Sequence, residues 1–566
     1  MRDMMLKGNS RTGNLLFLLS SVFVLLVPDI IFSFYESKSV LSFFVIVLSK
    51  SAFLLFMALV GVKLFRSYFI TYLLLGLVYI ISSTVEIVVV LILHDYVTFD
   101  NLKAVYFTNS REVSEFFDKA KWYFMISLLV LVIYIYNLVK MRSVVYEKRN
   151  NLLIYAAIAL IISVSLSLFR FSKSKDKYKI HNKTSFIVRK YYIKEPPFNF
   201  YWRLHELHSE YKRTAYLFKK YKKQRSEFVF GVKNDIDASQ RPETVVLIIG
   251  EKNRYSNWSI NGYERKTSPN LEKTKNLISF SKYYSNANCT ANSVPLIITQ
   301  ATPNNPERIY TQKTITSLFK ESGYKTTWIS SISVFEYINN ENELDEVIKL
   351  YKEKDNNSDL DILPAFNSLL KKEAGTKKFI VINMLGGHHK KLPDGFNKFE
   401  PNSKLKDYTL RYENRQVFIN DYDNMIMLED YVLSKIIEAA KKYDNSSLVL
   451  FVPDHGCHLF ESKDGNWFGY GSAVPTEAET HIPMFIWLSD KYIKGNEDKY
   501  DILLKNKDLL TTNDNVIYSI ANLSHINYQL YLPDQSFSDS SYVEPESRFV
   551  SVNGKSFEIK NGKIVQ

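Results

Sequence analysis

Cysteine is almost missing from this sequence, since only 2 of its 566 residues are Cys. So few thiols exclude a disulfide-rich scaffold, a zinc ribbon built from several cysteines and an iron–sulfur site. The part of the chain after residue 170 lacks long apolar runs, and no internal repeat is visible. The aromatic share of 14% excludes a disordered chain. The length predicts at least two domains.

Five apolar segments before residue 170 each approach the ~20 residues that a membrane-spanning helix needs. They cover residues 15–34, 40–62, 68–93, 123–139 and 152–169. The first is too long and too poorly cleavable to be only a signal peptide, and four more follow it. We therefore predict a multi-span α-helical membrane domain of five helices at residues 1–169.

The basic residues between these segments predict the orientation, because cytoplasmic loops carry an excess of Lys and Arg. With the N-terminus in the cytoplasm, the cytoplasmic pieces hold nine basic residues and the outer loops hold five. An odd number of spans then places everything after residue 170 outside the cytoplasm.

Residues 170–233 are unusually basic, with 18 Lys or Arg against 5 Asp or Glu. Their net charge of +13 equals the surplus of the whole chain. Basic residues with interleaved aromatic rings suit an anionic membrane surface. A nucleic-acid-binding segment would have the same composition, but the predicted position outside the cytoplasm argues against nucleic-acid binding. We therefore expect residues 170–235 to form a basic, aromatic juxtamembrane linker, and the alternative is a merely solvated linker.

The remaining residues, 236–566, alternate short apolar runs with helical patterns. The expected strands cover residues 244–249, 326–330, 379–385, 448–452 and 482–488, and the main helical pattern covers about 413–443. This alternation predicts an α/β sandwich with a mostly parallel sheet. Ligands of such sheets bind beyond the carboxyl ends of the strands. Near the C-terminus, Asn561 and Gly562 predict the turn of a hairpin over residues 549–565.

Three of these strands end in side chains that bind metals. Glu251 follows the first strand, Asp454 and His455 follow a later one, and the pair His388 and His389 follows a third. Carboxylates and imidazoles at neighbouring strand ends can converge on one cation, and such a set of oxygen and nitrogen ligands suits zinc.

A threonine lies where a loop is expected to enter a helix. Residues 288–295 have the composition of a loop, and the apolar residues 296–298 follow them. Near the N-terminus of a helix, positive potential and a metal would favour the alkoxide of Thr290, which would then be a nucleophile. The alternative is an N-cap threonine without a chemical role.

Several motifs taken together resemble the lipopolysaccharide phosphoethanolamine transferases. This family includes the lipid A-modifying and mobile colistin-resistance enzymes and belongs to the alkaline phosphatase and sulfatase superfamily. The resemblance covers nearly the whole chain, including the five spans. The motifs lie at residues 108–112, 245–254, 257–258, 261–269, 290–295, 386–388, 421–430 and 454–456.

The resemblance implies a role for each matching residue. Thr290 matches the nucleophilic threonine of the family. The zinc ligands of the family match Glu251, Asp454 and His455, and Thr290 completes the set. His388 matches a histidine near the leaving group or a second zinc ion.

The resemblance also extends to the expected outer loop and to the substrates. Thr108 and Glu112 match outer-loop positions that face the substrate headgroup. The implied donor is phosphatidylethanolamine and the implied acceptor is lipopolysaccharide, at lipid A or the core. The enzyme would sit in the bacterial inner membrane with its catalytic domain in the periplasm.

The implied reaction is a double displacement through Thr290, which would carry phosphoethanolamine after diacylglycerol leaves. His388 would protonate the leaving oxygen and deprotonate the acceptor, or would only make a supporting hydrogen bond. The added ethanolamine ammonium lowers the negative charge of lipopolysaccharide, so that cationic peptides such as polymyxin bind it less well.

The sequence departs from the family pattern at three places near the expected site. Lys252 replaces the usual threonine after the motif glutamate, and Cys457 replaces the last glutamate of the Asp-His-Gly-Glu motif. The histidine that follows this motif in the family has no counterpart, and Tyr470 is nearest to its place. These departures leave the first zinc site intact and leave a second zinc open.

The two cysteines, Cys289 and Cys457, must both lie near the zinc if Thr290 and His455 share it. An oxidising compartment allows a disulfide between them. A disulfide also needs Cα atoms within about 7 Å and aligned side chains, which spacing does not guarantee. We expect two free thiols packed as small apolar residues, and the bond is the alternative.

Three other functions compete with this interpretation. A phosphoglycerol transferase of the same superfamily would also have five spans and a threonine nucleophile. The second is a membrane-anchored hydrolase, either a phosphodiesterase or a sulfatase-like enzyme. A sulfatase would need a Cys or Ser in a C/S-x-P-x-R motif, and Cys289 does not lie in such a motif. A non-catalytic binding protein is the third, and the complete metal-ligand set argues against it.

Overall fold

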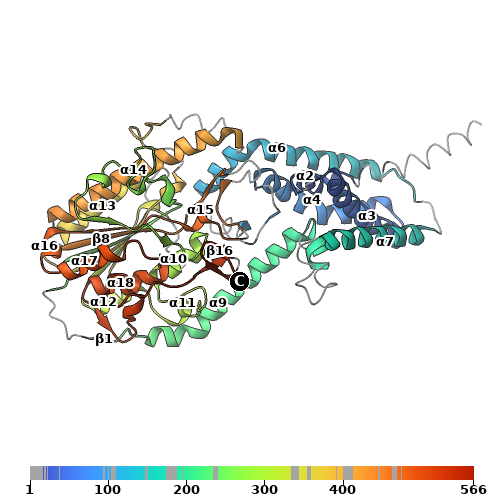
Figure 1. Ribbon diagram of the computed structural model, residues 1–566. Helices are drawn as coiled ribbons and strands as arrows, with labels where there is room; N and C mark the ends of the chain where they lie inside the picture. The colour runs from blue at the N-terminus through green and yellow to red at the C-terminus, as the bar shows by residue number, and fades with distance from the viewer. Residues whose placement is uncertain are drawn as a thin grey trace, which may run out of the picture. The chain divides into compact units, whose positions relative to one another are not determined.

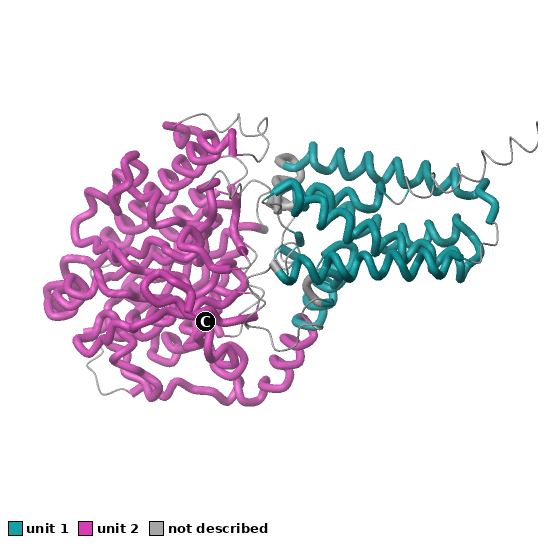
Figure 2. Tube along the Cα trace, turned by 45° about the vertical axis from the view of Figure 1, so that its right-hand side comes forward, with its two compact units in different colours: residues 1–102, 117–210, 464–467 teal, residues 103–116, 211–463, 468–566 magenta. Residues whose placement is uncertain are grey.

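The computed structural model describes residues 17, 21, 23–36, 39–93, 96–97, 99, 101–102, 110–146, 151–173, 188–193, 195–233, 240–332, 343–352, 358–389, 392–399, 412–443, 446–461, 468–472, 474–552 and 554–565. The chain forms two compact units (Figure 2). Unit 1 comprises Met1–Leu102, Phe117–Glu210 and Asp464–Trp467, and unit 2 comprises Lys103–Phe116, Tyr211–Lys463 and Phe468–Gln566. The division predicted at residues 169 and 235 stays a prediction.

Unit 1 is helical (Figure 1). Its helices are α2 (Val27–Glu36), α3 (Val40–Phe65), α4 (Tyr68–Leu93), most of α6 (Ser110–Met141), α7 (Leu152–Lys173) and the first part of α9 (Phe198–Glu227). Within the described residues, four stretches are long and apolar enough to cross a bilayer: Val40–Phe65, Tyr68–Ile92, Ala120–Met141 and Leu152–Ser172. Four of the five predicted spans are thus confirmed in length and composition.

The first predicted span, residues 15–34, lies partly outside the described residues. Its described part includes the first residues of α2.

A cluster of buried charges joins parts of unit 1 that are far apart in the sequence. Lys50 Nζ on α3 lies 2.5 Å from Glu195 Oε2 and 3.6 Å from Asp29 Oδ1. Arg170 at the end of α7 donates to the other Glu195 oxygen at 3.0 Å. Because an unpaired charge is costly in a membrane-spanning segment, this mutual pairing is what makes the buried charges tolerable.

Unit 2 is built on a seven-stranded sheet, in the order β3-β11-β8-β2-β7-β5-β6. The strands are β2 (Thr244–Gly250), β3 (Leu277–Ser279), β5 (Lys325–Ser330), β6 (Glu346–Lys349), β7 (Lys378–Asn383), β8 (Ser447–Pro453) and β11 (Phe485–Leu488). The five strands from β8 to β6 are parallel, and β11 is antiparallel to both of its neighbours. The predicted mostly parallel sheet is confirmed.

The register of the three central strands decides where the site forms. Ile249 near the end of β2 pairs with Val452 of β8 on one side and with Asn383 of β7 on the other. The carboxyl ends of these three strands are therefore level, and the residues that follow them begin at one edge of the sheet.

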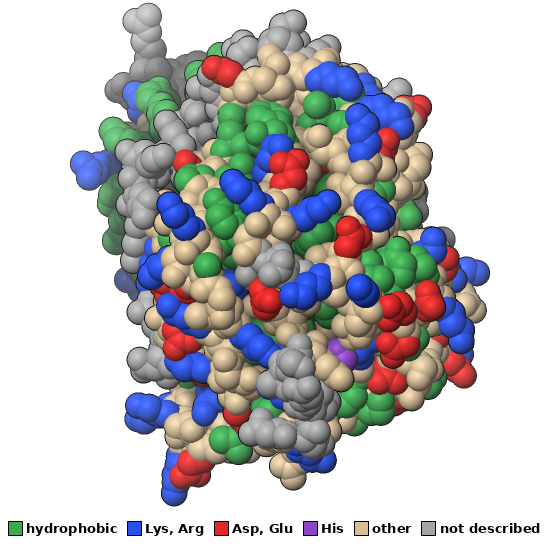
Figure 3. Space-filling model, turned by 90° about the vertical axis from the view of Figure 1, so that its left-hand side faces the viewer, with side chains coloured by type: hydrophobic (Ala, Val, Ile, Leu, Met, Phe, Trp, Pro, Cys, Tyr) green, Lys and Arg blue, Asp and Glu red, His purple; other side chains and the backbone are tan. Residues whose placement is uncertain are grey.

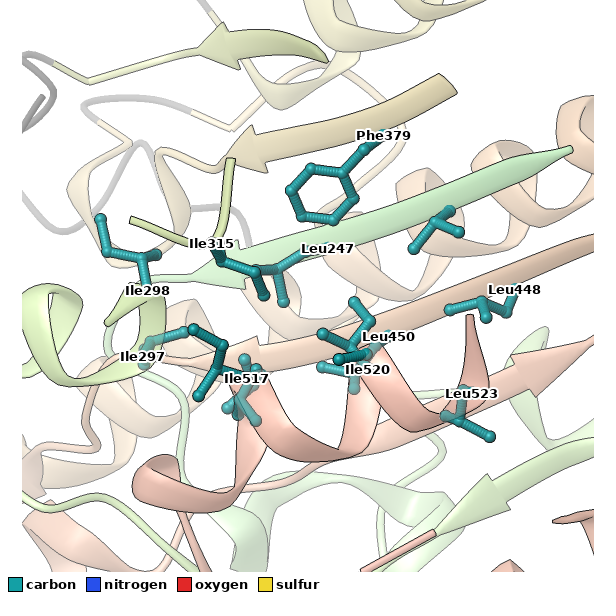
Figure 4. Packing of buried hydrophobic residues seen from close by; sticks show 14 of the residues in the cluster. Leu247, Ile297, Ile298, Ile315, Phe379, Leu448, Leu450, Ile517, Ile520 and Leu523 are labelled. Atoms are coloured by element: carbon teal, nitrogen blue, oxygen red, sulfur yellow. The ribbon is translucent and has the colours of Figure 1, made fainter. Parts of the chain in front are cut away.

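One face of the sheet packs against helices α10 (Thr290–Ile298), α12 (Ile315–Glu321) and α18 (Val516–Leu523). Alternate strand residues such as Leu247 point to this face and meet the apolar side chains of the three helices (Figure 4). Complete burial of one such side chain stabilises the fold by about 1.5–3 kcal/mol relative to exposure. This packing fixes α10, whose first residue is Thr290.

The opposite face packs against α13 (Ile362–Lys372) and α14 (Arg415–Tyr443). Helix α14 corresponds to the helix predicted over about 413–443. Val246 and Ile248, which alternate with the residues of the other face, belong to this second cluster. Unit 2 is therefore the predicted α/β sandwich, with helices on both faces of the sheet (Figure 1).

The C-terminal segment forms a three-stranded antiparallel sheet of β14 (Arg548–Val552), β15 (Lys555–Lys560) and β16 (Lys563–Ile564). The predicted turn at Asn561 and Gly562 is confirmed, since both residues have positive φ, at 50° and 72°, as a tight turn between twisted strands requires. Because β15 pairs with β14 as well as with β16, the segment predicted as a hairpin is a three-stranded sheet.

Basic and acidic side chains are both present and intermixed on the face shown in Figure 3. Exposed ion pairs of the second unit include Lys435 with Glu438 at 2.6 Å and Lys372 with Glu346 at 3.1 Å. Such pairs contribute little to stability, since water and salt screen them.

Candidate active site and metal centre

Three side chains with metal-binding atoms meet at the carboxyl edge of the sheet. Glu251 directly follows β2, and Asp454 and His455 directly follow β8. One ligand atom from each residue lies within 4.8 Å of the others. All three side chains are buried, with at most 1% of their surface exposed. The neighbouring strands thus bring together the three residues predicted to bind zinc.

Hydrogen bonding fixes which nitrogen of His455 faces this group. His455 Nδ1 lies 2.7 Å from the carbonyl oxygen of Gly456, which can only accept a hydrogen bond. The ring proton is therefore on Nδ1, and Nε2 keeps its lone pair. Nε2 lies 3.4 Å from Asp454 Oδ2 and 3.7 Å from Glu251 Oε1. This is the tautomer that a metal-binding histidine needs.

Among the described residues, no lysine or arginine pairs directly with either carboxylate. Burial, and then the charge of Glu251, raises the pKa of Asp454 to about 7, and burial also raises the pKa of Glu251. Asp454 Oδ2 is buried and has no hydrogen-bond donor among the described residues. A divalent cation at this position would favour both ionised carboxylates. Two carboxylates, one imidazole nitrogen and a nearby hydroxyl are a donor set that fits zinc.

Thr290 is the first residue of α10, and Cys289 before it is the N-cap. The alternative that Thr290 is the N-cap residue is therefore wrong. Its Oγ1 instead lies 3.1 Å from Glu251 Oε2 and 3.2 Å from His455 Nε2. The partial positive charge at the start of a helix favours negative charge on this oxygen.

His388 lies in a short 3-10 turn, Gly386–His388, after β7. Its Nε2 is 3.2 Å from Glu251 Oε1, so the turn brings His388 to the same group of residues. Its Nδ1 accepts a hydrogen bond from Lys252 Nζ at 3.1 Å. Both ring nitrogens therefore face polar partners within the site.

Two further histidines of unit 2, His389 and His458, contact different partners. His389 is buried, with Nδ1 2.6 Å from Gly386 O and Nε2 3.7 Å from Asp359 Oδ2. His458 bonds Glu461 at 2.8 Å and Thr476 at 2.9 Å. These contacts hold loops in place. Neither histidine belongs to the metal-binding triad of Glu251, Asp454 and His455.

Acidic residues of α14 anchor the loop that follows β2. Asp423 accepts hydrogen bonds from Asn257 at 2.8 Å, from Tyr263 at 2.9 Å and from Arg265 at 2.9 Å. Residues of two distant sequence motifs, 257–265 and 421–424, are thus in direct contact. The motifs around Asp423 hold the loop that begins at Glu251.

Tyr422, the residue before Asp423, anchors the start of the same loop. Its hydroxyl donates to Lys252 O at 2.7 Å and accepts from Arg254 N at 2.8 Å. Further along α14, Asp430 accepts from the backbone N–H of Leu271 at 2.9 Å. One helix therefore fixes both ends of the loop.

Several residues that position the site lie outside the sequence motifs, although Ser293 falls within the motif at 290–295. Ser285 and Ser293 both donate to the backbone oxygen of Asp454, from 169 and 161 positions away. Asn513 in turn donates to both serine hydroxyls, at 3.2 and 3.1 Å. On the other side of the site, Asp359 accepts from Gly386 N at 2.9 Å. Serine, asparagine and aspartate are too common in loops for their spacing to reveal these contacts.

Two predicted substrate-binding positions are not placed. Thr108 lies outside the described residues, and Glu112 lies in α6 but its side chain is outside the described part. Their predicted roles stay predictions.

Neither Cys289 nor Cys457 is in a disulfide and both are buried, so the expectation of two thiols without a disulfide is confirmed. Burial raises the pKa of the Cys457 thiol to about 12.

The family model for sulfatases matches residues 243–526, which is half of the chain and includes every residue of the metal-binding triad. The chain belongs to the sulfatase family. The matched part begins one residue before β2 and ends three residues after α18, so it takes in the whole seven-stranded sheet of this sulfatase-family chain.

Two curated relatives of this sulfatase-family chain are phosphoethanolamine transferases. EptC of Escherichia coli O18:K1:H7 is 26% identical over 323 residues, which cover 54% of this chain and 55% of EptC. The Kdo(2)-lipid A phosphoethanolamine 7″-transferase of Escherichia coli K12 is 24% identical over 278 residues, 47% of this chain and 48% of that protein. The chain spans about half the length of these relatives in the matches. The resemblance inferred from the motifs is confirmed.

Solved structures share the fold of this sulfatase-family chain. The integral membrane phosphoethanolamine transferase EptA of Neisseria meningitidis has a TM-score of 0.68 at 18% identity, covering 92% of this chain and 97% of that one. The zinc complex of the periplasmic domain of EptC from Escherichia coli has a TM-score of 0.51 at 22% identity, covering 59% of this chain and 96% of that one. A membrane domain followed by a sulfatase-like domain is therefore a known architecture.

Proposed function

We propose that this chain is a phosphoethanolamine transferase of the bacterial inner membrane, with its catalytic domain in the periplasm. It takes the headgroup of phosphatidylethanolamine and passes it to lipopolysaccharide, at lipid A or the core. The observation that carries the proposal is the position of the Thr290 hydroxyl, 3.1 Å from Glu251 and 3.2 Å from His455. The relatives named as phosphoethanolamine transferases support the choice of headgroup.

Membrane helices on the same chain support lipid substrates. A donor lipid already in the membrane needs no diffusion through water, and the helices keep the catalytic domain close to it. The excess of basic residues in the loops between the predicted spans supports the periplasmic placement, nine against five.

Glu251, Asp454 and His455, with the Thr290 hydroxyl, would hold one zinc ion. When bound, zinc supplies a Lewis acid that lowers the pKa of a hydroxyl and balances charge on a phosphoryl group. Ser285 and Ser293 keep Asp454 in place through its backbone oxygen. The Nδ1–H bond of His455 to Gly456 keeps Nε2 directed at Thr290.

In the first step, a bond forms between Thr290 Oγ1 and phosphorus, and the bond from phosphorus to the diacylglycerol oxygen breaks. Thr290 releases its proton to water, and the diacylglycerol oxygen gains one. We assign this second proton to His388, which lies 3.2 Å from Glu251. Diacylglycerol leaves, and Thr290 carries phosphoethanolamine as a phosphodiester.

In the second step, an oxygen of lipopolysaccharide attacks the same phosphorus from a hydroxyl or a phosphate group. The bond between phosphorus and Thr290 breaks, His388 takes up the proton of an attacking hydroxyl, and Thr290 regains a proton from water. The single nucleophile serves both displacements, so the enzyme returns to its starting state.

Mass spectrometry of lipopolysaccharide tests the proposal. Lipopolysaccharide from cells that express the chain should carry one more phosphoethanolamine than lipopolysaccharide from cells without it, and fragmentation should locate the new group. Purified full-length protein should transfer label from the ethanolamine headgroup of the donor. Transfer from phosphatidylglycerol instead would favour the phosphoglycerol alternative. Release of labelled phosphoethanolamine to water alone would favour a hydrolase.

A further inference from the structure

Lys252 holds a backbone conformation that a lysine rarely adopts. It directly follows the metal-binding Glu251, and its φ is +61°, in the left-handed region that disfavours a residue with a Cβ. Two hydrogen bonds hold it there. Its N–H donates to Asp454 Oδ1 at 3.2 Å, and its carbonyl oxygen accepts from Tyr422 at 2.7 Å. The strained backbone thus sets the direction of the Lys252 side chain.

The side chain of Lys252 lies across Gly387, toward the metal-binding triad. A Cβ at Gly387 would lie 2.9 Å from Lys252 Cδ and 3.0 Å from Lys252 Cβ, so only glycine leaves room for this path. At its end, Nζ donates to His388 Nδ1 at 3.1 Å and lies 4.7 Å from the centre of the Tyr470 ring. The Tyr470 ring in turn packs on His455, at 4.3 Å between ring centres.

Within the described residues, the direct contacts of the Lys252 ammonium are neutral, and the charge of Glu251 acts on it only from a longer distance. Within the described part of the chain, no carboxylate oxygen lies within 4.0 Å of Nζ, although Lys252 is only half-exposed. An aromatic ring and an imidazole nitrogen orient a cation without neutralising it. The charge of Lys252 is therefore available to an anionic ligand.

The same contact limits what His388 offers to a metal. Because a lysine ammonium only donates, His388 Nδ1 is the acceptor and the ring proton is on Nε2. That Nε2–H faces Glu251 Oε1 at 3.2 Å. Before the reaction, the Nδ1 lone pair is engaged by Lys252, and Nε2 carries the proton that His388 gives to the leaving oxygen. Neither nitrogen is then open to a second divalent ion, and the ammonium 3.1 Å away would repel one.

We propose that Lys252 is the second cationic group of this site and binds a non-bridging oxygen of the phosphodiester as Thr290 attacks it. The proposal rests on the function proposed above. Negative charge spreads over the non-bridging oxygens during phosphoryl transfer, and a fixed ammonium beside them stabilises it. A hydrogen bond between an ammonium and a phosphate oxygen is about twice as strong as a neutral one. The site then binds one zinc ion per chain.

Two substitutions separate the charge of Lys252 from its shape. Lys252→Met removes the charge and keeps most of the length, and Lys252→Arg keeps the charge. Lys273→Met changes an exposed lysine of the same unit and is the matched control. Full-length protein in detergent is used throughout. For each variant we would measure zinc per chain, the dissociation constant of inorganic phosphate for the zinc-loaded protein, and kcat and KM of headgroup transfer.

We expect one zinc per chain in the wild type and in all three variants. Phosphate should bind Lys252→Met about 10-fold more weakly, and kcat should fall about 100-fold, as for the loss of one donor to a developing oxyanion. Lys252→Arg should recover most of both losses, and Lys273→Met should match the wild type.

Three results would overturn the proposal. These are two zinc ions per wild-type chain, a loss of zinc in Lys252→Met that matches its loss of activity, and unchanged phosphate binding in Lys252→Met. Phosphate binding and zinc content need no lipid substrate. If no headgroup is transferred by any variant, the proposed function fails, while weaker phosphate binding by Lys252→Met still supports the role of Lys252.

Discussion

The Thr290 hydroxyl oxygen lies 3.2 Å from Nε2 of His455, a residue 165 positions further along the chain. Helix α10 brings the hydroxyl to this point and the end of β8 brings the imidazole. His455 directs the lone pair of Nε2 at Thr290 because its Nδ1–H is bonded to Gly456. A hydroxyl at the start of a helix, beside a metal-ligand set, is suited to become a nucleophile.

Substituting Thr290 by Ala should abolish transfer without unfolding the protein, since Thr290 is half-buried and its removal leaves no large cavity. Wild-type protein incubated with donor lipid alone should give a Thr290 peptide that carries phosphoethanolamine. Circular dichroism checks the fold. If Thr290→Ala keeps more than a tenth of the activity, a change of about 1.4 kcal/mol in the barrier or less, then Thr290 is not the nucleophile.

Asp454→Asn should lower zinc content and transfer together. The amide keeps the size of the side chain but loses the negative charge that balances a cation. Zinc per chain is measured by elemental analysis of the purified protein, and Glu264→Gln, an exposed acid of the same unit, serves as control. A chelator should remove the wild-type activity, and added zinc should restore it. Full activity in chelator with no zinc bound would contradict the metal site.

Unit 2 should become less stable as the pH rises, because Asp514 ionises. Burial raises its pKa to about 8 in the folded protein, from about 4 when unfolded. The folded state therefore binds a proton that the unfolded state lacks between these values, and this stabilisation is lost as the pH rises toward 8. Between pH 6 and pH 8 the loss is about 2.3 kcal/mol.

Asp514→Asn stays neutral and should remove this pH dependence. Thermal unfolding of both proteins at pH 6 and pH 8, at one zinc concentration, measures the difference. The variant should gain on the wild type as the pH rises. Parallel changes in the two melting temperatures would show that Asp514 does not titrate in this range.

Lys50→Met should destabilise the helical unit. The change leaves Asp29 and Glu195 buried with one positive partner fewer, and removing one partner of a buried ion pair costs about 3–5 kcal/mol. Thermal unfolding in detergent measures the loss, with the exposed Lys140→Met as control. A second change, Asp29→Asn, should recover part of the stability. Equal melting temperatures for Lys50→Met and Lys140→Met would argue against the buried cluster.

Unfolded, unreduced protein should take up two thiol-alkylating groups, because neither Cys289 nor Cys457 is in a disulfide. The folded protein should react slowly, since both side chains are buried and burial raises the pKa of Cys457 to about 12. Intact-mass spectrometry counts the added groups. An unfolded chain that takes up none would carry a disulfide.

Much of the fold follows from local pattern. Apolar length alone located the four spans that the described residues contain. The β-branched apolar runs located the parallel strands β2, β5, β7 and β8 and the antiparallel β11, but not the parallel edge strand β6. Such patterns are readable because burial acts on every residue of a run, so the signal repeats along the segment. The Asn561 and Gly562 turn was readable for a similar reason, since positive φ restricts the residue type.

The candidate site was readable in part. Glu251, Asp454 and His455 follow apolar strands, and the ends of parallel strands meet at one edge, so their meeting could be predicted. Their roles, with those of Thr290 and His388, stay predictions. The position of Thr290 depended on how α10 packs on the sheet, and its hydroxyl contacts needed the structure.

The sequence by itself determined which residue types stand at the strand ends and which segments are apolar enough for a membrane. Only the tertiary structure decided that Lys252 meets Tyr470 and His388, and that Ser285 and Ser293 hold Asp454. These contacts join single polar residues that lie 136 to 218 positions apart along the chain. A single contact leaves no repeating pattern, because it depends on the strand order and on helix packing that bring distant loops to the same edge of the sheet.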